Sequence, residues 1–147
     1  MIILTTVLLA GCKKEDAGSS SNSYTYENGG KPKTIKIAKV AYSMDGNEMT
    51  LLMYASDNEN DGIEFYLDSG QDFTVVPEGM FTNNSNPVTF SSAILYYDDG
   101  DESYTVKSIT RKIIIAKNGD EYKIDFEFTS GAGLVKGSYK GLVARLK

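Results

Sequence analysis

The sequence predicts an all-β domain, either an antiparallel β-sandwich or a calycin-like barrel of about eight strands, that follows a flexible tether. Short runs rich in Ile, Val, Phe and Tyr recur from residue 34 onward, and Gly, Asn and Asp separate them. No stretch shows the 3.6-residue period of an amphipathic helix of ordinary length. The chain has 147 residues, 41% of them hydrophobic, which is enough for one domain with a hydrophobic core.

The first expected strands cover residues 34–44, 48–56 and 62–68. In the first, the apolar positions are odd-numbered before Ala38 and even-numbered after Lys39, which strict alternation cannot produce. We therefore expect a bulge or bend there. The second strand is apolar on both faces, which favours a central, covered position. The third alternates between apolar and polar residues, as a half-buried strand does.

Further strands are expected over residues 88–97 and 103–107, and a hairpin over residues 109–128. Asn118-Gly119 is typical of a type I′ turn, which would pair Lys117 with Asp120 and place one apolar and one charged face on the hairpin. The last expected segment covers residues 134–146, where Gly137 and Gly141 suggest bends or a close backbone approach.

The amino-terminal part differs in composition from the rest of the chain. Residues 2–9 are apolar but too few to span a bilayer, which needs about 20 residues, and they fit a signal-peptide core of roughly 7–15 residues. Ser, Gly, Asn and charged residues dominate residues 13–33, as in a flexible tether. We therefore expect a signal peptide over residues 1–11, Cys12 and a tether over residues 12–33, and the β domain over residues 34–147.

Two motifs resemble those of known proteins. Leu8-Leu9-Ala10-Gly11-Cys12 resembles the lipobox of bacterial lipoproteins, in which a diacylglycerol is attached to the cysteine sulfur. Residues 113–128 and 135–142, with the patterns Tyr-x-Ile-x-Phe and Gly-x-Tyr-x-Gly, are similar to the end of small outer-membrane lipoproteins of Bacteroidota-type bacteria.

The turn segment Val76-Pro-Glu-Gly-Met-Phe81 is similar to one that often precedes those patterns in that group. The resemblance implies a lipid on Cys12, an outer-membrane location and exposure at the cell surface, because acidic residues (here Glu15 and Asp16) follow the cysteine. These lipoproteins are mostly of unassigned function, so no catalytic residue is implied.

Charge and composition exclude several classes of function. The net charge of −5 argues against a nucleic-acid partner, which would need a basic face. The chain contains no histidine, which removes Ser-His-Asp and Cys-His catalytic systems and the usual zinc sites. A glycosidase could still use two carboxylates, but no spacing singles out a pair. We expect no cofactor and no enzymatic activity.

One acidic stretch partly matches a calcium-binding loop. Asp57, Glu59 and Asp61, followed by Gly62, occupy the opening positions of the motif, and Asp68 occupies the twelfth. Glu59 is long for the third position, and a bidentate Glu is usual where Asp68 stands. These four residues are the candidate metal ligands, and a polar hairpin loop is the favoured interpretation.

Three further residues are candidates for ligand binding. Tyr66 and Tyr97 are expected on outer strand faces, where exposed rings can stack on sugars or peptides, although tyrosine also simply favours strands. Arg111, expected opposite Phe126, is the one charged residue on the apolar side of the hairpin. We expect it at the hairpin end near solvent; the alternative is an inward cation that serves a ligand.

The sequence therefore predicts a lipid-anchored, non-enzymatic binding or accessory module at the outer membrane, for a glycan, a peptide or a partner protein. One alternative is a closed barrel that carries a small apolar ligand inside. Another is a purely structural envelope protein.

Overall fold

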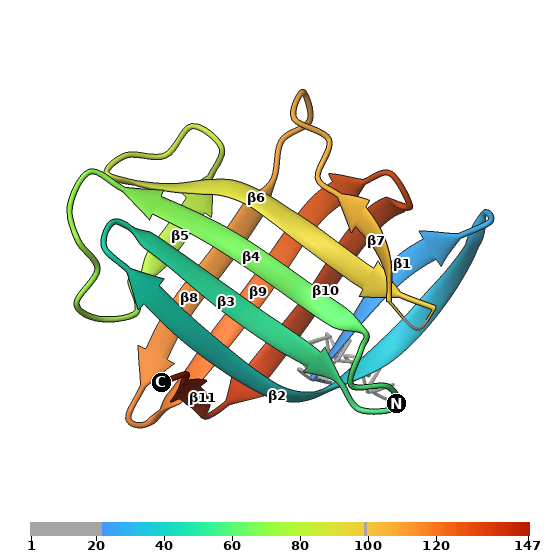
Figure 1. The fold of residues 1–147 in the computed structure, drawn as a ribbon, viewed down its shortest axis with the longest axis horizontal. Helices are drawn as coiled ribbons and strands as arrows, with labels where there is room; N and C mark the ends of the chain where they lie inside the picture. The colour runs from blue at the N-terminus through green and yellow to red at the C-terminus, as the bar shows by residue number, and fades with distance from the viewer. Residues whose placement is uncertain (1–21, 99) are drawn as a thin grey trace, which may run out of the picture.

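The computed structural model describes residues 22–98 and 100–147, and within them the chain is all β (Figure 1). The predicted fold class is confirmed. No helix in these ranges is both long and apolar enough to cross a membrane. The strands are β1 (Ser23–Asn28), β2 (Lys31–Asp45), β3 (Glu48–Ala55), β4 (Gly62–Ser69), β5 (Gly79–Thr82), β6 (Val88–Tyr97), β7 (Asp101–Tyr104), β8 (Lys112–Asn118), β9 (Glu121–Ser130), β10 (Gly133–Gly141) and β11 (Val143–Arg145).

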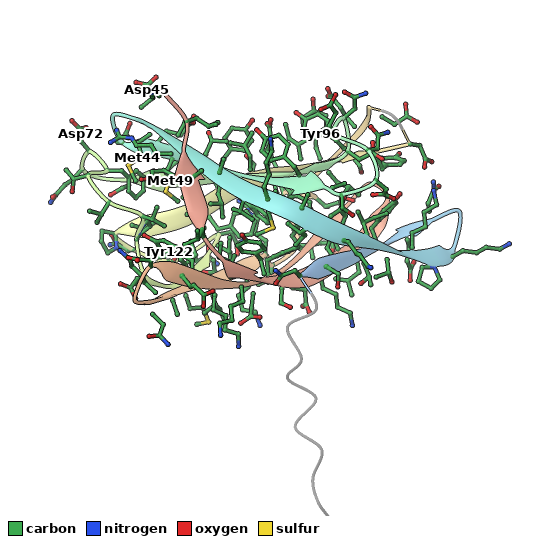
Figure 2. The ribbon with its side chains drawn as sticks, turned by 90° about the horizontal axis from the view of Figure 1, so that it is seen from below. Met44, Asp45, Met49, Asp72, Tyr96 and Tyr122 are labelled. Carbon is green, nitrogen blue, oxygen red and sulfur yellow. The ribbon has the colours of Figure 1, made fainter. Side chains whose placement is uncertain are left out.

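The strands form one antiparallel sheet that curls over itself, in the order β5-β8-β9-β10-β1-β2-β3-β4-β6-β7. β11 lies outside this path and pairs in parallel with the second half of β2. The curled sheet has two layers, with β3, β4 and β6 in one and β8, β9 and β10 in the other (Figure 2). The fold thus combines features of the sandwich and of the barrel, and short strands such as β5 and β11 raise the strand number above the expected value.

The long strand β2 passes from one layer to the other through a bulge. Its register with β3 shifts between Ile37 and Lys39, which confirms the bulge predicted at this place. Before the shift β2 pairs with β1, and after it β2 lies between β3 and β11. The extra residue inverts the alternation, so Ile37 and Val40 both point into the core.

The expectation of a flexible tether over residues 12–33 is wrong for its second half. Residues 23–28 form β1, which lies between β10 and β2, and β2 already begins at Lys31. The side chains of Tyr24 and Tyr26 are buried. Their spacing is the two-residue period of a strand, which the Ser-, Gly- and Asn-rich composition around them concealed. Cys12 and the signal peptide expected over residues 1–11 lie outside the described residues.

The tip of the β1–β2 hairpin is tied to the turn between β6 and β7. The ring centroids of Tyr26 and Tyr97 are 5.6 Å apart. The Lys33 ammonium pairs with the Asp98 carboxylate at 2.7 Å, and the amide of Asn28 donates a hydrogen bond to the same carboxylate at 2.6 Å. These contacts connect the β1–β2 hairpin, which lies in the middle of the strand order, to the end formed by β6 and β7.

The β8–β9 hairpin forms as predicted, but its register differs from the prediction. Asn118 pairs with Glu121, so the two-residue loop is Gly119-Asp120 and not Asn118-Gly119. Gly119 has a φ of +62°, the conformation required at the first loop position of a type II′ turn. Every pairing moves by two residues, which leaves the inward and outward faces as predicted.

Side chains from both layers fill the interior. Phe65 on β4 packs edge-on against Phe126 on β9, with ring centroids 4.9 Å apart, and also contacts Phe90 and Phe128. The largest side chains with almost no exposed surface are Tyr24, Phe65, Phe90, Phe128, Met49, Leu51, Met53, Ile63, Leu67, Leu95, Ile113 and Ile115. The interior is therefore a packed hydrophobic core that holds the two layers together.

Arg111 lies where the curled sheet is not closed by strand pairing, between the beginning of β8 and β6. It is 9% exposed, and its guanidinium donates hydrogen bonds to the carbonyl oxygens of Phe90, at 2.7 Å, and of Ser91. The expected solvent-facing position is therefore wrong, and the side chain points inward. Burial lowers the pKa of the guanidinium from its usual value. Backbone carbonyl oxygens, and not a carboxylate, accept its hydrogen bonds.

Candidate functional site

Four neighbouring strands place an aromatic surface on the outer side of one layer. Alternation sends every second residue of β3, β4, β6 and β7 outward, and many of these residues are tyrosines. We call this surface the tyrosine face. It consists of Leu52, Tyr54, Glu64, Tyr66, Ile94, Tyr96, Glu102 and Tyr104. Tyr96 points away from the other layer in Figure 2.

A hollow of about 260 Å³ lies on the tyrosine face where one strand lacks a side chain. Tyr54 on β3 and Tyr96 on β6 both pair with Gly62 on β4, so a glycine separates the two tyrosines. Glu64 and the β3–β4 loop, including Glu59, complete the lining. A Cβ atom on Gly62 would lie 2.1 Å from the carbonyl oxygen of Met53, so the backbone itself requires glycine here.

Glu64 is the hydrogen-bonding centre of the tyrosine face. The hydroxyl groups of Tyr66 and Tyr96 donate to the same carboxylate oxygen, at 2.6 and 3.3 Å. Burial and the Glu64 carboxylate raise the pKa of Tyr96 to about 12, and the same two causes raise the pKa of Tyr66. Both tyrosines therefore stay neutral donors that hold the carboxylate in place.

The ring of Tyr54 already carries a cation on one side. The Lys39 ammonium on β2 lies 4.5 Å from the centroid of this ring. Lys39 pairs with Tyr54 across the strands, on the side opposite Gly62. Tyr54 thus lies between an ammonium group on one side and the hollow on the other.

The outer side of the other layer has a different chemistry. Here Lys112 pairs with Glu127, and Lys136 lies opposite Glu127 on the next strand. The Lys123 ammonium lies 3.3 Å from the Asp125 carboxylate, and both side chains are well exposed. We call the outward side chains of β8, β9 and β10 the charged face.

The residues predicted for ligand binding are only partly brought together. Tyr66 lies on the outer side of β4, as predicted. Tyr97 does not, because Leu95 and Tyr97 share the inward face and Tyr97 packs on Tyr26. The Arg111 side chain points inward, but its guanidinium donates hydrogen bonds to two carbonyl oxygens of β6.

The calcium-binding interpretation is wrong. Asp57, Glu59 and Asp61 belong to the β3–β4 loop, whereas Asp68 stands near the far end of β4, seven residues of extended chain beyond Asp61. At about 3.3 Å per residue this separates the two carboxylates by roughly 20 Å. Among residues 22–98 and 100–147 there is no group of three or more His, Cys, Asp or Glu side chains placed to hold a metal ion.

Sequence reasoning missed Tyr54, Tyr96 and Glu64. The alternation of residues 93, 95 and 97 would have placed Tyr96 outward in place of Tyr97. The apolar outer positions of β3 were attributed to a covered strand, although Leu52 and Tyr54 lie half-buried on the tyrosine face. Strand order, which brings β3 and β6 to either side of β4, was not available from the sequence pattern.

The sequence matches no protein-family model, no curated protein and no solved structure.

Proposed function

We propose that this chain is a membrane-anchored, extracytoplasmic, non-enzymatic binding module, and that its tyrosine face binds a glycan. The observation that carries the proposal is the hollow between Tyr54 and Tyr96, bordered by a carboxylate that two hydroxyl groups hold in place. A second hollow, beside the β8–β9 turn, also holds a tyrosine and a carboxylate, Tyr122 and Glu121, but it has a single ring, and three lysines line it.

The chemistry of the tyrosine face suits a sugar. Tyrosine rings offer a flat apolar surface on which the C–H groups of a sugar ring can stack, with a polar hydroxyl at the edge. A carboxylate accepts hydrogen bonds from pairs of neighbouring hydroxyl groups. Because Glu64 is already oriented, a ligand would not need to order it, which reduces the entropic cost of binding.

The resemblance of the amino-terminal segment to a lipobox supports the anchoring part of the proposal. A lipid on Cys12 would connect to the domain at Asn22 through ten residues, which span at most about 35 Å. Two acyl chains hold a protein on a membrane durably, whereas one does so only weakly. The proposed location is the outer membrane, with the domain at the cell surface.

The carrier alternative has less support. A barrel that carries a small apolar ligand needs free space inside, as in larger barrels with ligand cavities. Here Phe65, Phe90 and Leu95 are 0% exposed and the phenylalanine rings contact one another across the core. A filled interior disfavours an internal ligand and leaves the outer surface as the place for binding.

Glycan binding can be tested with a panel of immobilised glycans. The probes are the full chain carrying Cys12→Ser and the double variant Tyr54→Ala/Tyr96→Ala. The control is Lys123→Ala/Asp125→Ala, which alters the charged face. We expect the starting chain and the control to bind the same glycans and the tyrosine variant to lose them. Binding that only the control variant loses, or no binding to any glycan, would overturn the proposal.

Anchoring can be tested by metabolic labelling with a clickable fatty acid. We expect the wild-type chain to take up the label and to sediment with outer membranes, and Cys12→Ala to do neither. Protease treatment of intact cells should then remove the domain. An unlabelled chain that stays in the soluble fraction would contradict the anchoring.

A further inference from the structure

The hollow on the tyrosine face has the width of a slot for one sugar ring. Tyr54 and Tyr96 stand two strand spacings apart, which places their Cα atoms about 9–10 Å from each other. A saturated ring stacked between two aromatic rings needs a contact of about 3.5–4.0 Å on each side. Gly62 leaves the floor between the tyrosines without a side chain. This backbone spacing and the hollow of about 260 Å³ leave room above Gly62 for one sugar ring.

The residues that line the slot carry only negative charge, and the nearest cation that a ring contact places beside it is the Lys39 ammonium behind Tyr54. Glu59, Asp61 and Glu64 line the hollow, and no Lys or Arg is among the described residues that do so. An anionic ligand, such as a uronic acid or a sulfated or phosphorylated sugar, would meet three carboxylates there, against the single Lys39 ammonium behind Tyr54. A cationic group would be attracted, and more strongly than in bulk water because the slot is partly shielded from solvent.

The aromatic rings favour a cation for a second reason. A tyrosine ring attracts an ammonium to its face. The Lys39 ammonium already occupies one side of Tyr54, so Tyr96 is the ring that remains for a ligand ammonium. The Tyr96 hydroxyl donates a hydrogen bond to the Glu64 carboxylate, which draws negative charge toward that ring. The slot thus joins the Tyr96 ring to the carboxylates of Glu59, Asp61 and Glu64.

We infer that the slot between Tyr54 and Tyr96 binds a sugar that carries a protonated amino group, such as a residue of a deacetylated hexosamine polymer. The inference rests on the proposed glycan-binding function and names its ligand. The sugar ring stacks between the tyrosines, its hydroxyl groups donate to the carboxylates, and its ammonium lies against Glu64. N-Acetylation removes the positive charge and adds bulk, so it weakens binding.

The test compares a β-linked glucosamine tetramer with its fully N-acetylated counterpart by calorimetry, using the full chain with Cys12→Ser. We expect the amino tetramer to bind at least about tenfold more tightly. Glu64→Gln keeps the shape of the side chain and should bring the two affinities close together. Tyr96→Ala should abolish binding of both, while Lys123→Ala/Asp125→Ala, on the charged face, should leave them unchanged.

The outcomes separate this inference from the function on which it rests. If both tetramers bind equally and Tyr96→Ala removes both, glycan binding stands and the preference for an ammonium is wrong. If the amino tetramer binds the tyrosine variants as well as the starting chain, general attraction to a chain of net charge −5 explains it and the site is wrong. The Tyr→Ala variants keep that net charge, and their circular dichroism spectra must match that of the starting chain. Absence of binding by any glycan would overturn both proposals.

Discussion

The two layers of the sheet share a core but differ on their outer sides. The charged face alternates Lys with Asp and Glu along neighbouring strands, as between Lys112, Glu127 and Lys136. The tyrosine face carries rings and carboxylates, and Lys39 on the neighbouring strand β2 lies over one of its rings. Alternating exposed charges keep a sheet soluble and contribute little stability. A concentration of half-buried rings around an oriented carboxylate has no such explanation, and this difference supports the proposal of a binding site on the tyrosine face.

The largest expected effect concerns β1, which joins the two layers. A chain that begins at residue 34 lacks β1 and the start of β2, and it would expose core positions that Tyr24 and Tyr26 cover. We expect residues 34–147 not to fold, whereas residues 22–147 unfold cooperatively. Circular dichroism during heating distinguishes the two. A cooperative transition of equal midpoint for both chains would contradict the position of β1 in the sheet.

A smaller loss is expected at Arg111, which connects the layers where strand pairing leaves a gap. Arg111→Met would leave the carbonyl groups of Phe90 and Ser91 without their donors in a buried place. We expect the free energy of unfolding to fall by about 2–4 kcal/mol in urea titrations. Arg145→Met, on an exposed position of β11, is the control and should change it by less than about 0.5 kcal/mol. Equal effects of both variants would refute the structural role of Arg111.

The hydrogen bonds on the tyrosine face predict an alkaline titration. Tyr96 is neutral when protonated, and its folded-state pKa of about 12 lies above the ordinary value of 10.0. Its contribution to stability is therefore complete below about pH 10 and declines as the pH rises toward 12. Glu64→Gln removes one cause of the shift but not burial, so tyrosinate absorbance should appear at lower pH than in the wild-type chain. Tyr96→Phe identifies the signal, and superimposable titrations of the wild type and Glu64→Gln would argue against the contact.

The smallest effect is expected on the charged face. Lys123→Ala and Asp125→Ala each remove one partner of an exposed ion pair. We expect each to change the free energy of unfolding by less than about 0.5 kcal/mol, because solvent screens such pairs. Thermal unfolding measures this, and a loss above about 1 kcal/mol would show that the charged face is more than a solvated surface.

The sequence pattern was sufficient for local features and insufficient for those that depend on distant strands. Alternation and turn residues predicted the bulge beside Ala38, the β8–β9 hairpin and the fold class. The predicted register of the hairpin was wrong because a glycine with positive φ fits both the second loop position of a type I′ turn and the first loop position of a type II′ turn. The predicted tether extended too far along the chain because its Ser-, Gly- and Asn-rich composition concealed the alternation of Tyr24 and Tyr26.

The candidate site was predicted only in part for the same reason. Tyr66 follows from alternation within one strand, whereas the slot requires β3 and β6 on either side of Gly62. Arg111 was placed near solvent because its partners, Phe90 and Ser91, lie about 20 residues away in the chain. Contacts of this kind come from strand order, which a single sequence does not specify.

The most direct test of glycan binding by the tyrosine face is a map of backbone amide shifts by NMR. The full chain with Cys12→Ser is titrated with the glucosamine tetramer. We expect shifts concentrated in β3, β4 and β6 and in the loop that contains Glu59, with β8, β9 and β10 unchanged. Shifts concentrated on the charged face would contradict this expectation, because the ligand would then bind through exposed lysines and carboxylates and not through the tyrosine face.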